Sequence, residues 1–197
     1  MRSNVCRIEN GVQDLEAILR ESEKVAVYNE LDHKQSLQLR LLCEEVDGML
    51  PNLINDFGGN FWIDFEDGVC KVNVSIELAR FTVAKKKELV AIATNKKNAA
   101  AVGICGKIRS VLENLICDAD VVDTLNMSMD AFNISNAYLA GMNYAHVWSL
   151  DRYKTTVDKE TEAYDELERS VIAAVADDVI VGVTAKRADI IIVKKFA

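Results

Sequence analysis

The chain has 197 residues, half of them hydrophobic, and its 31 acidic and 23 basic side chains give a formal net charge of −8. This composition excludes intrinsic disorder and a disulfide-stapled mini-protein, because the chain is long and apolar enough to bury a core unaided. The acidic balance argues against nucleic acid or an anionic membrane surface as a partner, since both select basic surfaces.

The predicted elements follow from hydrophobic periodicity and turn signals. In chain order they are a strand-like start at 4–8, a helix at 12–28, a helix from 33 to 50 or slightly beyond, strands at 60–66 and 69–80, a helix at 104–117, a long helix at 149–175, and strands at 178–185 and 189–196. Asp32 can cap the second helix, Pro51 should kink or restart it, and Asp67-Gly68 predicts a tight turn. Residues 118–147 follow neither period.

These strands come in hairpins rather than singly between helices. This order favours an α+β fold, a two-layer sandwich with helices on one face of a mainly antiparallel sheet. The length favours one domain over 1–197, with an atypical segment at 118–147. No apolar run approaches the roughly 20 residues of a membrane span, and no signal-peptide core is present, so a cytoplasmic location is expected.

Metal and nucleophile signatures are weak in this sequence. Its five cysteines have no C-x-x-C spacing and mostly sit in apolar runs, so they are expected to be buried thiols. Only two histidines are present, and they form no recognisable triad or metal cluster. The sequence therefore predicts no metal site.

The first candidate site is the acidic pair on the second predicted helix. Glu44 should point almost opposite the core stripe, whereas Glu45 should lie near its border beside Gly48. A border carboxylate beside a glycine can face a cleft. The alternative interpretation is a solvated boundary acid.

The second candidate is a glycine pair where a loop enters the 104–117 helix. Gly103 and Gly106 are three residues apart and Lys107 follows, so backbone N–H groups and a cation could meet a phosphate. The spacing is not that of a P-loop. Tight helix-on-sheet packing with a solvated Lys107 is the alternative.

The order of these features resembles the GHKL ATPase superfamily, which includes histidine-kinase catalytic domains and anti-sigma-factor serine kinases. The resemblance rests on a Glu-Glu helix, a β-hairpin, a small and cationic loop, Gly103-x-x-Gly106 opening a helix, and a final hairpin. It implies a sandwich of that type, in which Gly103, Gly106 and Lys107 line the phosphate side and Glu45 is the remnant acid. Thr94, Asn95 and Asn98 would lie on the lid loop.

Most of the chain also resembles uncharacterised ATP-binding-like proteins of anaerobic Firmicutes. This likeness is carried by four segments: 39–49, 98–109, Trp148-Ser149-Leu150-x-x-Tyr153, and 165–179.

The chain departs from the GHKL motifs at the metal and the adenine. The family's magnesium-binding Asn, four residues after its Glu, falls on Met49 if Glu45 is the match and on Gly48 if Glu44 is. No D-x-G-x-G follows the hairpin, where Glu77 is the only acid near the right place. The resemblance therefore covers the scaffold and the phosphate-side glycines.

Three functions remain open at this stage. The first is a regulatory protein with a degenerate histidine-kinase-like ATPase domain that binds ATP or ADP, with magnesium doubtful and a sigma-factor or other regulatory protein as partner. The second is a non-catalytic interaction module of anti-sigma type, with the Met-containing 118–147 segment as contact surface. The third is an ATPase or serine kinase whose metal ligands are Asn52 or Asn55.

Overall fold

The structure is a computed structural model that describes residues 1–9, 15–53, 57–77, 106–112, 146–156, 170–183 and 187–196. These residues form the strands and helices β1 (Cys6–Glu9), α1 (Leu15–Tyr28), α2 (His33–Leu53), β2 (Gly58–Glu66), β3 (Val69–Glu77), β4 (His146–Ser149), α5 (Leu150–Thr156), α7 (Val171–Val175), β5 (Asp178–Val183) and β6 (Arg187–Lys195). Residues 106–112 form a further short helical segment.

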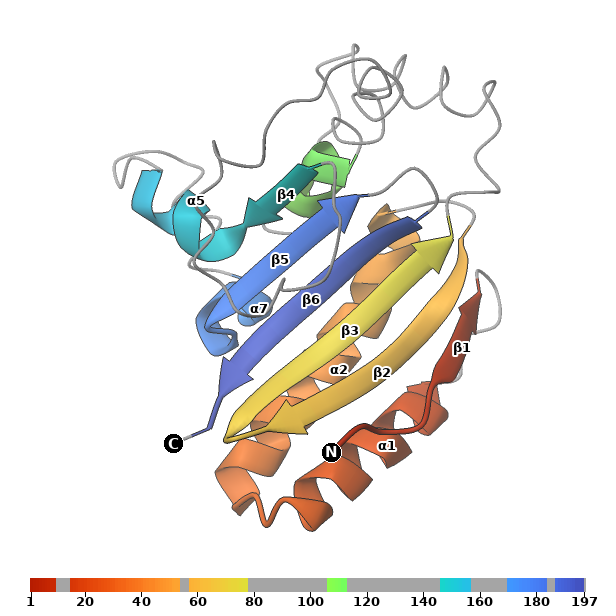
Figure 1. The fold of residues 1–197 in the computed structure, drawn as a ribbon, viewed down its shortest axis with the longest axis vertical. Coiled ribbons are helices and arrows are strands. Elements are labelled where there is room, and N and C mark those ends of the chain that lie inside the picture. Colours follow the sequence, from red (N-terminus) through yellow and green to blue (C-terminus); the bar gives the residue numbers. More distant parts are fainter. Residues whose placement is uncertain are drawn as a thin grey trace.

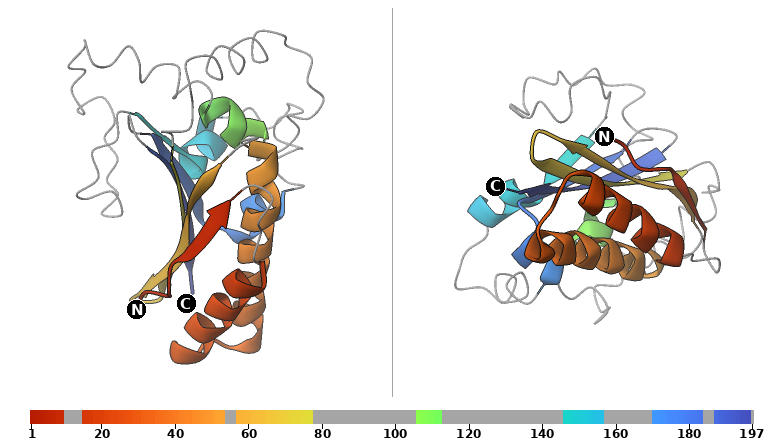
Figure 2. Two further views of the ribbon diagram at one scale, coloured as in Figure 1. Left: turned by 90° about the vertical axis from the view of Figure 1, so that its right-hand side faces the viewer. Right: turned by 90° about the horizontal axis from the view of Figure 1, so that it is seen from below.

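The six strands form one antiparallel sheet in the order β1-β2-β3-β6-β5-β4. Helices α1 and α2 lie together on one face of this sheet (Figures 1 and 2). The predicted two-layer α+β sandwich is therefore confirmed.

The core lies between the sheet and the helices. Alternate residues of the central strands face it, such as Val72 and Val74 of β3 and Ile190 and Ile192 of β6, because side chains alternate along a strand. From α2 it receives the apolar stripe that the sequence predicts: Leu39, Leu42, Val46, Met49, Leu50 and Leu53. The 106–112 segment contributes Ile108 and Leu112 to the same core.

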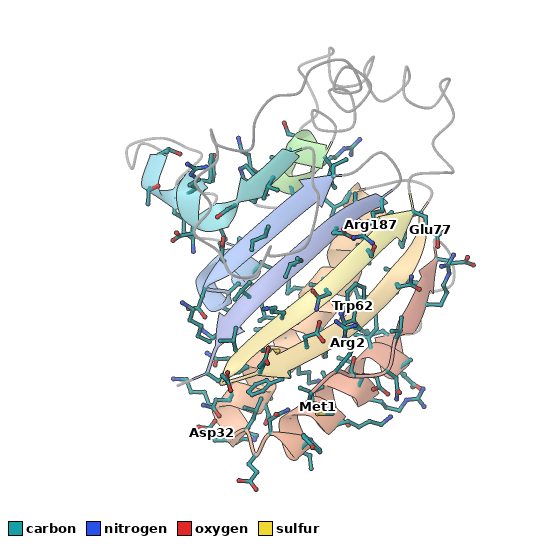
Figure 3. All side chains as sticks on the ribbon, in the orientation of Figure 1. Met1, Arg2, Asp32, Trp62, Glu77 and Arg187 are labelled. Atoms are coloured by element: carbon teal, nitrogen blue, oxygen red, sulfur yellow. The ribbon has the colours of Figure 1, made fainter. Side chains whose placement is uncertain are left out.

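The opposite face of the sheet is divided in two. Toward β5 and β6, Ile180, Ile191 and Val193 form a second apolar cluster. Toward β1 and β2 the face is polar, and Figure 3 shows Arg2 and Trp62 lying on it.

Two local signals of the N-terminal half act as the sequence predicts. Asp32 Oδ1 accepts a hydrogen bond from Gln35 N at 2.8 Å, and Gln35 Oε1 accepts one from Asp32 N at 3.0 Å. This reciprocal pair is a capping box at the start of α2. In the β2–β3 turn both Asp67 and Gly68 have positive φ, as a two-residue hairpin loop of this hand requires.

Helix α2 continues through Pro51 to Leu53, so of the two predicted effects of the proline, a kink or a restart, the restart does not occur. Three other predictions about secondary structure need correction. The helix predicted over 149–175 is wrong: α5 covers only Leu150–Thr156, and α7 begins separately after Ser170, whose backbone is extended and whose hydroxyl caps Ala173 N. The stretch predicted without a period ends in strand β4, and Arg187 begins β6 rather than forming the turn.

Candidate functional site

In the acidic pair of α2, Glu44 forms an ion pair and Glu45 forms none with a described residue. Glu44 Oε1 accepts a hydrogen bond from Arg40 Nε at 3.0 Å, and Arg40 also reaches Glu23 of α1 at 3.1 Å. Glu45 is half-exposed and its side chain has no hydrogen-bond or ion-pair partner among the described residues. Of the two acids, both of which are partly exposed, Glu45 is therefore the one available to a ligand.

A third acid on the same helix, Asp47, is not among the residues predicted from the sequence. Asp47 is buried, and burial raises the pKa of its carboxyl above the ordinary range. Its position between the buried Val46 and Met49 places it at the edge of the core stripe, a signal that a helical wheel of α2 contains. Gly48, next along the chain, is exposed, and a Cβ added there would meet no atom within 4 Å.

The structure describes two of the residues predicted to line the phosphate side, Gly106 and Lys107. Gly106 and Lys107 begin the 106–112 segment, where Gly106 is buried and Lys107 is half-exposed. Gly103, Thr94, Asn95 and Asn98 lie outside the described residues, as do Asn55 and the lysines 85–87 of the small and cationic loop.

Lys107 belongs to a cluster with two aromatic side chains. Its Nζ lies 4.5 Å from the centroid of the Tyr153 ring, a distance typical of a cation–π contact. The Tyr153 ring lies 5.9 Å from that of Trp148, with the planes tilted by 47°. No described carboxylate pairs with Lys107. Its positive charge therefore lies against the Tyr153 ring and has no compensating carboxylate within the described ranges.

A carboxylate of β5 positions the helix that carries Tyr153. Asp178 Oδ1 accepts hydrogen bonds from Ser149 Oγ at 3.0 Å, Asp151 N at 2.9 Å and Val179 N at 2.8 Å. The Asp151 N–H belongs to the first turn of α5, where backbone donors have no partner within the helix. Asp178 thus fixes the start of α5 against the sheet and so sets the place of the Tyr153 ring.

The structure brings Lys107 to α5, and in Figure 2 the 106–112 segment lies beyond the C-terminal end of α2. Lys107 and Glu45 thus belong to the same helical layer, but no contact joins them. Glu77 is turned the other way: it alternates with the core residue Ile76 and its Oε1 accepts a hydrogen bond from Arg7 at 2.8 Å. Figure 3 shows it beside Arg187, its register partner on β6. Glu77 therefore lies on the open face of the sheet, away from the helices.

A polar network that the sequence did not suggest lies on the open face of the sheet. Asp64 binds Arg2 through both carboxylate oxygens, at 2.7 and 3.1 Å, and accepts a hydrogen bond from Trp62 Nε1 at 2.9 Å. The Arg2 guanidinium also lies over the Trp62 ring, 5.7 Å from its centroid. The charged groups of Arg2 and Asp64 and the Trp62 N–H are thus paired with one another, which indicates a structural role for these residues.

The described part of the chain holds no group of three or more His, Cys, Asp or Glu side chains arranged to bind a metal ion. Cys43 and Cys70 are buried and unpaired by disulfide, and burial raises the pKa of the Cys70 thiol to about 12. Within the same ranges, no helix combines the length and apolarity needed to cross a bilayer.

Comparisons with known proteins add no assignment to this geometry. A scan against protein-family models, a search of curated proteins and a search of solved structures each gave no match.

Proposed function

We propose that the protein is a cytoplasmic regulatory protein with a degenerate GHKL-type ATPase domain that binds a nucleotide or a related phosphate ligand. The observation that carries this proposal is Lys107: a cation of the 106–112 helical segment that lies over Tyr153 and has no carboxylate partner among the described residues. In a chain with an acidic surplus, a lysine with no described carboxylate partner is a ready ligand for an anion.

Two further features support the proposal. The described elements follow the order on which the GHKL resemblance rests, with the β2–β3 hairpin before the 106–112 segment and the β5–β6 hairpin after it. Glu45 offers a partnerless carboxylate on α2, the helix that carries the acid in the resembled proteins. The positions of the family's metal-binding Asn and adenine motif are not filled here, so binding without turnover is the expected outcome.

A thermal-shift titration with ATP and ADP, each with and without magnesium, tests this function. A ligand that binds only the native state at about 100 times its Kd stabilises it by roughly 2.7 kcal/mol. Lys107→Gln should abolish the shift. Lys195→Gln, which removes an exposed lysine from the end of β6, should leave it intact. A magnesium-dependent shift would instead support the kinase alternative, and the absence of any shift at millimolar nucleotide would contradict nucleotide binding.

A second candidate, an interaction module without nucleotide binding, is favoured by one observation. Leu37 and Leu41 of α2 are exposed although the chain has a large core to receive apolar side chains. This alternative predicts that nucleotides cause no thermal shift. It also predicts that the chain binds a different protein, and that this binding is lost when Leu41 becomes polar.

A further inference from the structure

The solvent-facing side of α2 carries an apolar pair flanked by opposite charges. Leu37 is 51% and Leu41 36% exposed, and both lie opposite the buried stripe of the helix. Along the same solvent-facing stripe, Lys34 precedes this pair and Glu45 follows it. We name this set of four residues, Lys34, Leu37, Leu41 and Glu45, the α2 stripe.

The two charges of the α2 stripe have no partner in the part of the chain that the structure describes. Neither the Lys34 nor the Glu45 side chain makes a hydrogen bond or ion pair with a described residue, whereas the neighbouring Arg40 and Glu44 pair with each other. Eleven residues of α-helix separate Lys34 from Glu45, about 16 Å along the axis, so the two cannot pair in one copy.

The pattern is complementary to itself when a second copy runs antiparallel. The midpoint between Lys34 and Glu45 and the midpoint between Leu37 and Leu41 differ by half a residue, about 0.8 Å of helix rise. A two-fold axis near this point therefore sets Leu37 of one copy against Leu41 of the other. It also brings each Lys34 opposite the Glu45 of the other copy.

We infer that the α2 stripe is a self-association surface, through which two copies of this chain pair α2 against α2 in antiparallel orientation. The inference goes beyond nucleotide binding: the nucleotide proposal is carried by Lys107, which lies outside the α2 stripe, and Glu45 is the one residue that both proposals use. Two leucines per copy form a small apolar centre, so the dimer is weak and concentration-dependent rather than obligate. Its ion pairs are solvent-exposed, so salt weakens it.

Sedimentation velocity of the full chain, from about 10 μM to about 500 μM at low and high salt, tests the inference. The expected result is a reversible dimer whose population falls as salt rises. Lys34→Glu and Glu45→Lys should each raise the dimer Kd about tenfold or more, because each substitution turns two attractive pairs into two repulsive ones. The mixture of the two variants restores complementarity at both ends, so it should form a mixed dimer that neither variant forms alone.

Matched controls separate this surface from non-specific effects. Lys195→Glu makes the same change in net charge at the end of β6 and should leave the dimer unchanged. Leu41→Ser should weaken the dimer, whereas Leu15→Ser, at a leucine of α1 with the same 36% exposure, should not. Circular dichroism checks that the variants remain folded. The inference is overturned if the chain stays monomeric throughout the range, if the dimer survives Lys34→Glu and Leu41→Ser, or if the variant mixture fails to associate.

Discussion

Lys107 and Tyr153 are 46 positions apart in the sequence, yet the lysine Nζ lies 4.5 Å from the centre of the tyrosine ring. This contact ties the 106–112 segment to α5 and orients the one candidate phosphate-binding cation that the structure describes.

The coupling between these two residues is measurable by a double-mutant cycle. Tyr153→Leu and Lys107→Gln, singly and together, should give a coupling free energy of about 0.5–1 kcal/mol in chemical unfolding, the magnitude of an exposed cation–π contact. Tyr153→Phe keeps the ring and should retain most of this coupling. Additive effects of the Tyr153→Leu and Lys107→Gln substitutions would show that the contact contributes nothing to stability.

The carboxylate of Asp178 should contribute more to stability than an ordinary strand residue does. Asp178→Ala leaves the Asp151 and Val179 N–H groups without their acceptor, and we expect it to lower the free energy of unfolding by about 1–3 kcal/mol. Asp151→Ala, which removes an exposed carboxylate from the same helix, should change it by no more than about 0.5 kcal/mol. Urea unfolding of both variants tests the difference, and equal effects would contradict this role for Asp178.

Glu21 should make the protein sensitive to acid. Burial alone would raise the pKa of its carboxyl, but hydrogen bonds from Lys24 at 2.6 Å and from Asn4 outweigh burial and hold that pKa below the ordinary value. A carboxyl with a lowered pKa contributes stability above its unfolded pKa of about 4.3, and this contribution disappears as the pH falls through the folded pKa. The Tm advantage of the parent over Glu21→Gln should therefore be largest near neutral pH and shrink below about pH 4. An advantage that is constant with pH would contradict this explanation.

The thiols of Cys43 and Cys70 should be unreactive in the native protein. Burial is the main cause that raises both pKa values, to about 12 for Cys70, so the reactive thiolate is scarce at pH 8. Pulse labelling with iodoacetamide followed by peptide mass spectrometry should leave both unmodified in buffer and modify both in denaturant. Rapid labelling in buffer would mean that the packing of α2 on β3 opens readily.

Local signals were sufficient to predict the first half of the fold. The core stripe of α2, the Asp32 cap and the Asp67-Gly68 turn each depend on residues within a few positions of one another, so a sequence contains them directly. The Arg40–Glu44 pair also has the i, i+4 spacing of a helical ion pair, and this spacing could have identified Glu45 as the unengaged acid.

Long-range contacts explain why the 149–175 helix was wrongly predicted. Its apolar periodicity is real, but Ser149 belongs to strand β4, which pairs with β5, and it bonds to Asp178, 29 residues away, at the point where α5 begins. Ser170 then starts α7 as a new cap. Neither the Lys107–Tyr153 contact nor the Asp64–Arg2 network could be predicted, because each joins segments whose proximity only the folded sheet creates.

The place of β6 in the sheet has a consequence for how this protein is made. This strand, Arg187–Lys195, is the last of the described strands in sequence but sits between β3 and β5, so it alone joins the β1–β2–β3 ladder to the β5–β4 ladder. While a ribosome is still synthesising the chain, β1–β2–β3 and β4–β5 cannot join into one sheet until residues 187–195 emerge. Completion of the sheet must then close loops of more than a hundred residues, which slows folding. The β3 edge remains open to wrong partners throughout that interval.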